Sequence, residues 1–190
     1  MRIGIDVDDT ITDTWEMIIP YYVSLYGMNA NDLIKSNPYY QAIKDKVTVD
    51  EYYKTIKPIL HKNIPNVPIK KDVSRVINKL HEKGNEIIFI TSRSSNDNIE
   101  PYQKTVDYLN KHNVYYDKII IGQDRKDEVC LEEKIDLFID DSNKHCDQVA
   151  TAGIDVLMFE TAYNKNNLKH RHVFSWKEIE NDILGESNGE

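Results

Sequence analysis

The sequence RIGIDVDDT, residues 2–10, places a short apolar run directly before a cluster of carboxylates. The apolar residues from Ile3 to Val7 predict a strand that is buried on both faces, as the strands of parallel sheets are. Ligands of open parallel sheets lie beyond the carboxyl ends of the strands. The acidic side chains at this end, Asp6, Asp8 and Asp9, are therefore the first candidates for a functional site.

The same form, an apolar run that ends in polar residues, returns along the chain and predicts further strands at 86–91, 118–122, 135–140 and 154–159. Segments between them have helical spacing, as at 73–80, or read as helices at 101–111 and 143–152. A capping-box pattern at Ser175 and Glu178 predicts a last helix that ends at Gly185. Because strands and helices alternate, we expect an α/β fold: a Rossmann-like, mostly parallel sheet flanked by helices.

Residues 13–69 break this alternation, because they contain no strand-like run. The capping box of Thr48 and Glu51 predicts a helix start, and Gly27 predicts a helix end. We therefore expect several short helices inserted after the first strand, with Pro20 and Pro58 kinking or ending theirs. The expected organisation is a core of residues 1–12 and 70–190 and a small helical cap of residues 13–69.

Aromatic side chains are dense in the expected helical cap, which holds eight Trp and Tyr residues. A small helical unit needs large side chains for a core of its own. A wall against which a ligand packs uses the same large surfaces with polar tips. The sequence leaves both uses open and assigns neither to a single residue.

Composition limits the classes of partner. The chain has 190 residues, 24 Lys and Arg against 32 Asp and Glu, and a net charge of −8. An acidic chain without a basic cluster does not favour binding of a nucleic-acid polymer. The sequence shows neither a signal peptide nor a membrane-length apolar run, so we expect a cytoplasmic protein with no membrane partner. A homo-oligomer stays open, because nothing in the sequence sets the oligomeric state.

Glycine spacing excludes the common backbone cradles for phosphate. The chain has seven glycines, and they form neither a GxGxxG nor a GxxxxGK[ST] pattern. A dinucleotide cofactor or a nucleoside triphosphate bound by a P-loop is therefore not expected. Any phosphate group must be held by side chains, a metal ion or a helix start.

Polar residues that suit phosphoryl chemistry follow four of the predicted strands. They are Asp6 and Asp8, then Thr91 and Ser92, then Lys126, and finally Asp140 and Asp141. Carboxylates gathered at one edge repel one another unless a positive charge lies among them, and hard oxygen ligands suit Mg²⁺. The combination therefore predicts a Mg²⁺-dependent phosphoryl site, although each piece alone is common in turns and helix caps.

This order of motifs resembles the haloacid-dehalogenase superfamily of phosphatases. The likeness rests on the DVDDT stretch from Asp6 to Thr10, a strand ending in Thr91 and Ser92, the basic Lys126, and a strand ending in Asp140 and Asp141. The helical insert, the short length and the segments around Thr91 and Lys126 are most similar to the 5′(3′)-deoxyribonucleotidase, or cytosolic type C nucleotidase, group. The resemblance implies a phosphomonoesterase that acts on a small phosphorylated metabolite, here a 5′- or 3′-(deoxy)nucleoside monophosphate.

A covalent mechanism is implied by the same resemblance. Asp6 would attack phosphorus and form an aspartyl-phosphate, and Asp8 would protonate the leaving oxygen and later take a proton from water. Thr91 would donate its hydroxyl to a phosphoryl oxygen, next to the Ser92 main chain, and Lys126 would neutralise developing charge.

The implied Mg²⁺ ligands are the Asp6 carboxylate, the Asp8 main chain and the Asp140 carboxylate, and Asp141 would fix the outer shell of the metal. Thr10 would support the turn. The Asp at position 8 is typical of the phosphatases and phosphomutases of the superfamily and is absent from its dehalogenases.

Alternatives to a nucleotidase remain. Arg93 stands where the nucleotidases carry Pro, so the substrate could also be a sugar phosphate or another small phosphometabolite. A receiver-like signalling domain also combines an Asp pair with Thr and Lys, but its phosphoacceptor follows a third strand where this sequence predicts helices. His145 and Cys146 lack the spacing of a zinc site and are expected to lie on a helix.

Overall fold

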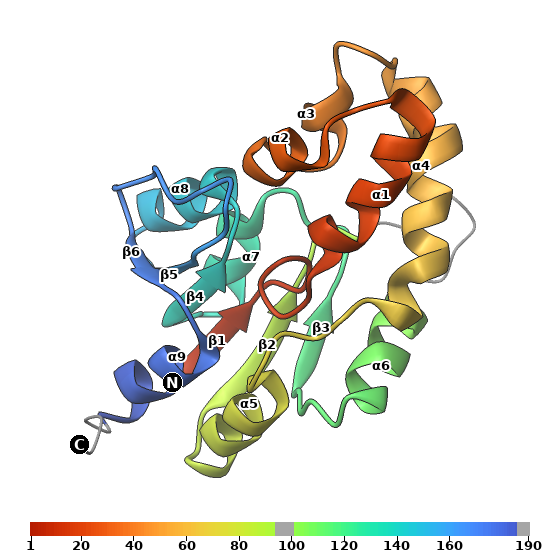
Figure 1. Ribbon diagram of the computed structural model, residues 1–190. Helices are drawn as coiled ribbons and strands as arrows, with labels where there is room; N and C mark the ends of the chain where they lie inside the picture. Colours follow the sequence, from red (N-terminus) through yellow and green to blue (C-terminus); the bar gives the residue numbers. More distant parts are fainter. Residues whose placement is uncertain (94–100, 186–190) are drawn as a thin grey trace, which may run out of the picture.

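The strands form one parallel sheet. The computed structural model describes residues 1–93 and 101–185, and within them the sheet has six strands in the order β3-β2-β1-β4-β5-β6 (Figure 1). Their bounds are β1 (Arg2–Ile5), β2 (Glu86–Ile90), β3 (Lys118–Ile120), β4 (Leu137–Asp140), β5 (Asp155–Phe159) and β6 (Arg171–Val173). Because β1 pairs with both β2 and β4, the loops after these three strands meet at the same edge. The predicted parallel α/β sheet is confirmed.

Helices cover both faces of the sheet. They are α5 (Val73–Glu82), α6 (Pro101–Lys111), α7 (Lys126–Glu132), α8 (Asn143–Thr151) and α9 (Trp176–Leu184). Helix α5 has the predicted spacing, and its four apolar residues at this spacing are all buried. The Ser175 hydroxyl accepts a hydrogen bond from the backbone N–H of Glu178 at 3.2 Å, which confirms the predicted start of α9.

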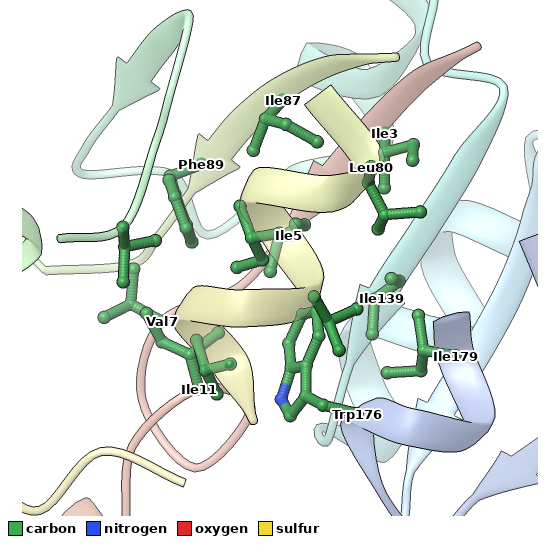
Figure 2. Close-up of a cluster of buried hydrophobic side chains, with 14 of the residues drawn as sticks. Ile3, Ile5, Val7, Ile11, Leu80, Ile87, Phe89, Ile139, Trp176 and Ile179 are labelled. Atoms are coloured by element: carbon green, nitrogen blue, oxygen red, sulfur yellow. The ribbon is translucent and has the colours of Figure 1, made fainter. Parts of the chain in front are cut away.

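Alternate residues of the strands point to opposite faces and build two cores. On one face, Ile3 and Ile5 of β1 and Phe89 of β2 pack with α5, α6 and α9; Figure 2 shows part of this cluster with Trp176 of α9. On the other face, Ile88 and Phe138 belong to a cluster with residues of α7 and α8. The sheet is buried on both sides, so its carboxyl edge is left to carry polar side chains.

Gly4 lets the strands approach closely at the centre of the sheet. A Cβ atom at this position would lie 2.9 Å from Phe138, 3.2 Å from Ile135 and 3.3 Å from Ile90. The first of these distances is shorter than carbon atoms tolerate. The close packing beside β1 therefore depends on a residue without a side chain.

Helices α1 (Thr14–Tyr26), α2 (Ala30–Lys35), α3 (Tyr40–Ile43) and α4 (Val49–Asn63), with a 3₁₀ turn at Ile64–Asn66, follow the first strand. Figure 1 shows them above the carboxyl end of β1, away from α5 and α9. They have a hydrophobic cluster of their own, which includes Trp15, Tyr22 and Tyr52. Thus the expected helical insertion is present, although α1 and α4 are longer than the short helices that were expected.

Neither proline ends its helix. Pro20 lies inside α1 and Pro58 inside α4. Both side chains are exposed, as are Glu16 and Lys54, four residues before them. The carbonyl groups that lose their helical N–H donor therefore face the solvent, where water can bind them.

The two ends of the helical insertion are paired. Thr12 forms an antiparallel bridge with Ile69, and the backbone N–H of Asp13 donates to the carbonyl of Pro68 at 3.0 Å. The chain therefore leaves and returns to the sheet at one place. In the part of the chain that the structure describes, no helix is long and apolar enough to cross a membrane.

Candidate active site

The predicted polar residues converge on one cleft. Its volume is about 800 Å³, and its lining residues include Asp6, Asp8, Thr91, Ser92, Asp140 and Asp141. The carboxylates come from the ends of β1 and β4, and the hydroxyls from the end of β2. This is the edge at which the loops after three neighbouring strands meet. Of the site residues that the sequence singled out, Asp9 and Lys126 do not line the cleft, but Lys126 is bonded to two carboxylates that do.

Lys126 is completely buried between two carboxylates. It is the first residue of α7, and its ammonium group donates hydrogen bonds to Asp6 and, at 2.7 Å, to Asp140. A buried charge is stable only when it is paired. The position of Lys126 therefore follows from the two carboxylates, and its charge compensates part of theirs.

The two carboxylates respond differently to this ammonium group. Burial raises the pKa of Asp6 to about 6, against the opposing attraction of Lys126. Burial would also raise the pKa of Asp140, but the charge of Lys126 and the nearby His145 outweigh it and hold this pKa at about 2. Asp140 is thus the more firmly ionised of the pair.

Asp141 is surrounded by hydroxyl and amide donors. Its carboxylate accepts hydrogen bonds from Thr10, at 2.9 Å, and from Tyr163. Its backbone carbonyl accepts a hydrogen bond from the side chain of Asn164 at 2.7 Å. Burial and the neighbouring charges, Asp140 first, raise the pKa of Asp141 well above its ordinary value. Thr10 thus holds Asp141, and its support of the turn after the first strand stays a prediction, while Tyr163 and Asn164 had no signal in the sequence.

The oxygen atoms of Asp6, Asp140 and Asp141 suit a hard metal ion. One carboxylate oxygen from each lies within 4.8 Å of the other two, and all three residues are buried. Lys126 supplies one positive charge to this group, so an excess of negative charge remains if all three are ionised. An all-oxygen donor set of this kind fits a divalent cation such as Mg²⁺.

Asp8 is held by a buried arginine. The Nε atom of Arg93 lies 2.8 Å from Asp8 Oδ2, and its Nη2 atom lies 2.7 Å from Oδ1. The Thr14 hydroxyl also donates to Oδ1, at 2.7 Å. Burial would raise the pKa of Asp8, but the Arg93 charge and these hydrogen bonds lower it. The sequence singled out Arg93 only as a departure from the nucleotidase pattern and did not predict this pair.

Asp9 connects the loop after β1 to the inserted helices. Its backbone is left-handed, with φ of 64°, and its carboxylate accepts hydrogen bonds from the backbone N–H of Trp15 at 2.7 Å and the Tyr39 hydroxyl at 2.6 Å. Burial raises the pKa of Asp9 to about 7. This carboxylate therefore fixes the start of α1 and the segment before α3 relative to the site.

Thr91 and Ser92 lie where the end of β2 meets the cleft. The Thr91 side chain is buried, and its Oγ1 atom accepts a hydrogen bond from the backbone N–H of Arg93 at 3.3 Å. Ser92 is exposed, and its hydroxyl donates to the carbonyl of Gln123 at 2.8 Å. The contacts of these residues hold the turn after β2 at the edge of the cleft.

Tyrosines contribute to the lining of the cleft as well. Those that line it are Tyr39, Tyr40, Tyr52, Tyr53 and Tyr163. Tyr40 and Tyr52 pack edge to face, with ring centroids 5.5 Å apart. The aromatic residues of the insertion thus build a core of their own, to which Tyr52 belongs, and their use as a wall for a ligand stays a prediction.

His145 also reaches the carboxylates. It lies in the first turn of α8, and its Nδ1 atom is 3.3 Å from Asp140 Oδ2. As expected, it lies on a helix with Cys146, and both cysteines are free and buried. What the sequence missed is that the turn at Ser142 directs His145 back toward the site.

The receiver-like alternative does not fit this geometry. It requires a strand that carries a phosphoacceptor Asp after the first Asp pair. Residues 13–66 instead form helices and the segments between them, and the next strand, β2, ends before Thr91 and Ser92. The carboxylates at the site come from β1 and β4, which are neighbours in the sheet.

Comparisons with known proteins agree with the motifs. A family model described as 5′ nucleotidase, deoxy (pyrimidine), cytosolic type C protein matches residues 1–187. A curated nucleotidase of Clostridium acetobutylicum is 29% identical over 185 residues, which cover 94% of this chain and 91% of the relative. The sequence similarity therefore spans the inserted helices as well as the sheet.

Solved structures share the fold at low sequence identity. A haloacid dehalogenase-like hydrolase from Streptococcus pneumoniae aligns with a TM-score of 0.73 at 12% identity, over 96% of this chain and 97% of its own. CbbY from Rhodobacter sphaeroides, solved with phosphate, aligns with a TM-score of 0.63 at 11% identity, over 94% of this chain and 95% of its own. These similarities show the fold, and they confirm the predicted likeness to haloacid-dehalogenase proteins.

Proposed function

Because the chain belongs to the family of cytosolic type C 5′ nucleotidases, and is therefore a phosphatase of the haloacid-dehalogenase superfamily, we propose that it is a Mg²⁺-dependent hydrolase of (deoxy)nucleoside monophosphates. The observation that carries the proposal is the make-up of the cleft. Carboxylates suited to phosphoryl transfer and several tyrosines line the same cleft, whose volume is about 800 Å³. Such a cleft has the size and mixed polarity of small-molecule sites. A cytoplasmic location is part of the proposal.

In the proposed reaction, Asp6 attacks phosphorus in line and forms an aspartyl-phosphate, while Asp8 gives a proton to the leaving nucleoside oxygen. Water then cleaves the acyl phosphate, and Asp8 takes its proton. This division replaces one difficult displacement by two easier ones. Asp6 suits its role because its carboxylate lies at the edge of the sheet and beside a buried ammonium group.

Other residues of the chain bind and orient the phosphate. Lys126 is proposed to compensate charge on Asp6 and on the transferred phosphoryl group, and the Thr91 hydroxyl and Ser92 main chain to bind phosphoryl oxygens. The carboxylates of Asp6 and Asp140 and the main chain of Asp8 would hold Mg²⁺, and Asp141 would orient the metal. When bound, Mg²⁺ supplies a positive charge that lets an anionic nucleophile approach an anionic phosphate.

Residues 13–69 are proposed to act as a cap that selects the substrate, with residues 1–12 and 70–190 as the core. Support comes from the paired ends of this segment at Thr12 and Ile69 and from its separate hydrophobic cluster. Tyr39 and Tyr53 place aromatic surface along the cleft that the carboxylates also line. A flat nucleobase can stack on such rings, whereas a sugar phosphate offers no comparable apolar face.

The test is phosphate release from a panel of 5′- and 3′-nucleoside monophosphates, deoxynucleotides and sugar phosphates. We expect release from nucleotides with Mg²⁺, loss of release in excess EDTA, and loss in Asp6→Asn. The matched control is Asp50→Asn, since Asp50 is an exposed carboxylate on α4 that pairs with Lys54. Release from sugar phosphates alone would contradict the substrate class, and turnover by Asp6→Asn would contradict the covalent mechanism.

A further inference from the structure

The Asp8 carboxylate is held by Arg93 and Thr14. Its Oδ2 atom accepts a hydrogen bond from Arg93 Nε, and its Oδ1 atom accepts hydrogen bonds from Arg93 Nη2 and the Thr14 hydroxyl. The Arg93 side chain is 5% exposed, against 23% for Asp8. The guanidinium is therefore more shielded from solvent than the carboxylate that it holds, although Arg93 also contributes to the lining of the cleft.

Arg93 is itself anchored at both ends. Its Nη1 atom donates to the Thr105 hydroxyl of α6 at 3.2 Å, and that hydroxyl donates to the carbonyl of Pro101 at 2.8 Å. At the main chain, the Arg93 carbonyl accepts a hydrogen bond from the N–H of Gly122 at 2.7 Å. An arginine fixed in this way presents its two nitrogen atoms to a carboxylate in one orientation.

We propose that Arg93 is a positioning residue that aims the Asp8 carboxyl group at the leaving-group oxygen. The inference rests on the proposed function, in which Asp8 transfers protons. During phosphoryl transfer the O–H bond of the Asp8 carboxylic acid breaks and an O–H bond forms on the nucleoside oxygen. During hydrolysis a water O–H bond breaks, its oxygen bonds to phosphorus, and the proton returns to Asp8.

The geometry explains why an arginine suits this task. When Oδ2 of Asp8 carries a proton, its Oδ1 atom still accepts hydrogen bonds from two directions, Arg93 Nη2 and the Thr14 hydroxyl. The group can thus change charge without losing its direction. Lysine offers a single point of attachment and would leave the carboxyl group free to rotate.

Two substrates whose leaving groups differ in their need for a proton distinguish a positioning role of Arg93 from a merely structural one. A nucleoside oxygen leaves poorly and needs the proton from Asp8, whereas p-nitrophenolate leaves without one. Loss of Arg93 should therefore slow phosphoryl transfer from a nucleotide far more than transfer from p-nitrophenyl phosphate. A general disturbance of the site would slow both to the same degree.

The experiment is single-turnover phosphoryl transfer by the wild type, Arg93→Lys and Arg93→Gln, with deoxynucleoside 5′-monophosphate and with p-nitrophenyl phosphate. We expect Arg93→Lys to lose about 100-fold with the nucleotide and less than about fivefold in the burst of p-nitrophenol. In an Asp8→Asn background, Arg93→Lys should change the nucleotide rate less than about threefold, because its effect passes through Asp8. Arg93→Lys keeps the positive charge, so it carries the test if Arg93→Gln does not fold.

The control is Arg75→Lys. Arg75 also donates two hydrogen bonds to a buried carboxylate, that of Glu180, but it lies on α5 outside the cleft. Its substitution should leave the ratio of the two rates unchanged. Equal losses with both substrates in Arg93→Lys, or a full additional loss in the Asp8→Asn background, would overturn the inference while the proposed function stands. A wild-type protein that releases phosphate from neither substrate would overturn both.

Discussion

Lys126 and Asp6 lie 120 positions apart in the sequence, and the ammonium group of Lys126 donates a hydrogen bond to the Asp6 carboxylate inside the protein. The same group bonds to Asp140, so one cation joins the ends of β1 and β4. The order of the strands thus determines where this positive charge lies in the site. The sheet order makes β1 and β4 neighbours, and α7 begins where its first side chain can enter between their carboxylates.

Lys126→Met should reduce kcat/KM for phosphomonoester hydrolysis by about 100- to 1000-fold, because the charge that compensates Asp6 and the phosphoryl group is lost. Steady-state kinetics measure the change, and circular dichroism checks the fold. The control is Lys134→Met, at an exposed lysine that precedes β4. Wild-type rates in Lys126→Met would remove this residue from the site.

Mg²⁺ should stabilise the folded protein, because it binds carboxylates that are brought together only by folding. At about 100 times its dissociation constant, the gain is about 2.7 kcal/mol in the free energy of unfolding. Thermal melts with Mg²⁺ and with EDTA measure the gain as a shift in Tm. Asp140→Asn should abolish the shift, and Asp50→Asn should keep it. An equal shift in both variants would argue against the buried carboxylates as the metal site.

Glu180 should make stability depend on pH in the acid range. Its side chain is fully buried and accepts hydrogen bonds from Arg75, Lys79 and Lys177. Burial would raise its pKa, but these cations lower it from 4.5 to about 2. A lowered pKa stabilises the fold above the unfolded value, and the gain is lost as the pH falls from about 4.5 to about 2.

Glu180→Gln should therefore lower the free energy of unfolding at pH 7 by about 1–2 kcal/mol, a modest loss because its partners are partly exposed. Urea unfolding at a series of pH values measures the difference from wild type, which should shrink toward pH 2. Glu82→Gln, at an exposed position of α5, is the control. A difference that stays constant from pH 7 to pH 2 would be incompatible with this pairing.

Substitution of Gly4 should destabilise the fold without any change at the cleft. Gly4→Ala adds a Cβ atom 2.9 Å from Phe138, and Gly4→Val adds two further methyl groups. We expect a loss of about 1–3 kcal/mol for alanine and a larger loss for valine. Chemical unfolding measures both, and a valine variant as stable as the wild type would contradict the packing at this position.

The sequence was most informative where local pattern and topology coincide. Apolar runs that end in polar residues predicted the strands and, since parallel strands end at one edge, the convergence of Asp6, Thr91 and Asp140. Lys126 lies several residues after its strand. Only the need for a positive charge among the carboxylates indicated that it belongs to the site. The roles of these residues in catalysis stay predictions.

Contacts made by single side chains from distant segments could not be predicted. Three such hydrogen bonds form only when the sheet and the inserted helices have packed. They join Arg93 to Asp8, Tyr39 to Asp9 and Tyr163 to Asp141. Each of these residue types is common in loops, so no local signal marks it.

The short edge strand β6 was also missed as a strand. His172 lies in this strand and His170 directly before it. In the structure both side chains are largely buried, and they pair with Asp147 and Glu160. These acidic partners lie 23 and 12 positions away in the sequence, beyond the reach of local patterns.

The central claim is that the cleft recognises a nucleoside monophosphate and hydrolyses its phosphoester. The most direct test compares kcat/KM for a deoxynucleoside 5′-monophosphate with kcat/KM for 2-deoxyribose 5-phosphate, which has the same phosphoester and no base. Stacking of a base on the tyrosines that line the cleft is worth about 1–3 kcal/mol. We therefore expect a preference of about 10- to 100-fold for the nucleotide. Equal values for the two substrates would contradict nucleotide recognition and leave a phosphatase of sugar phosphates.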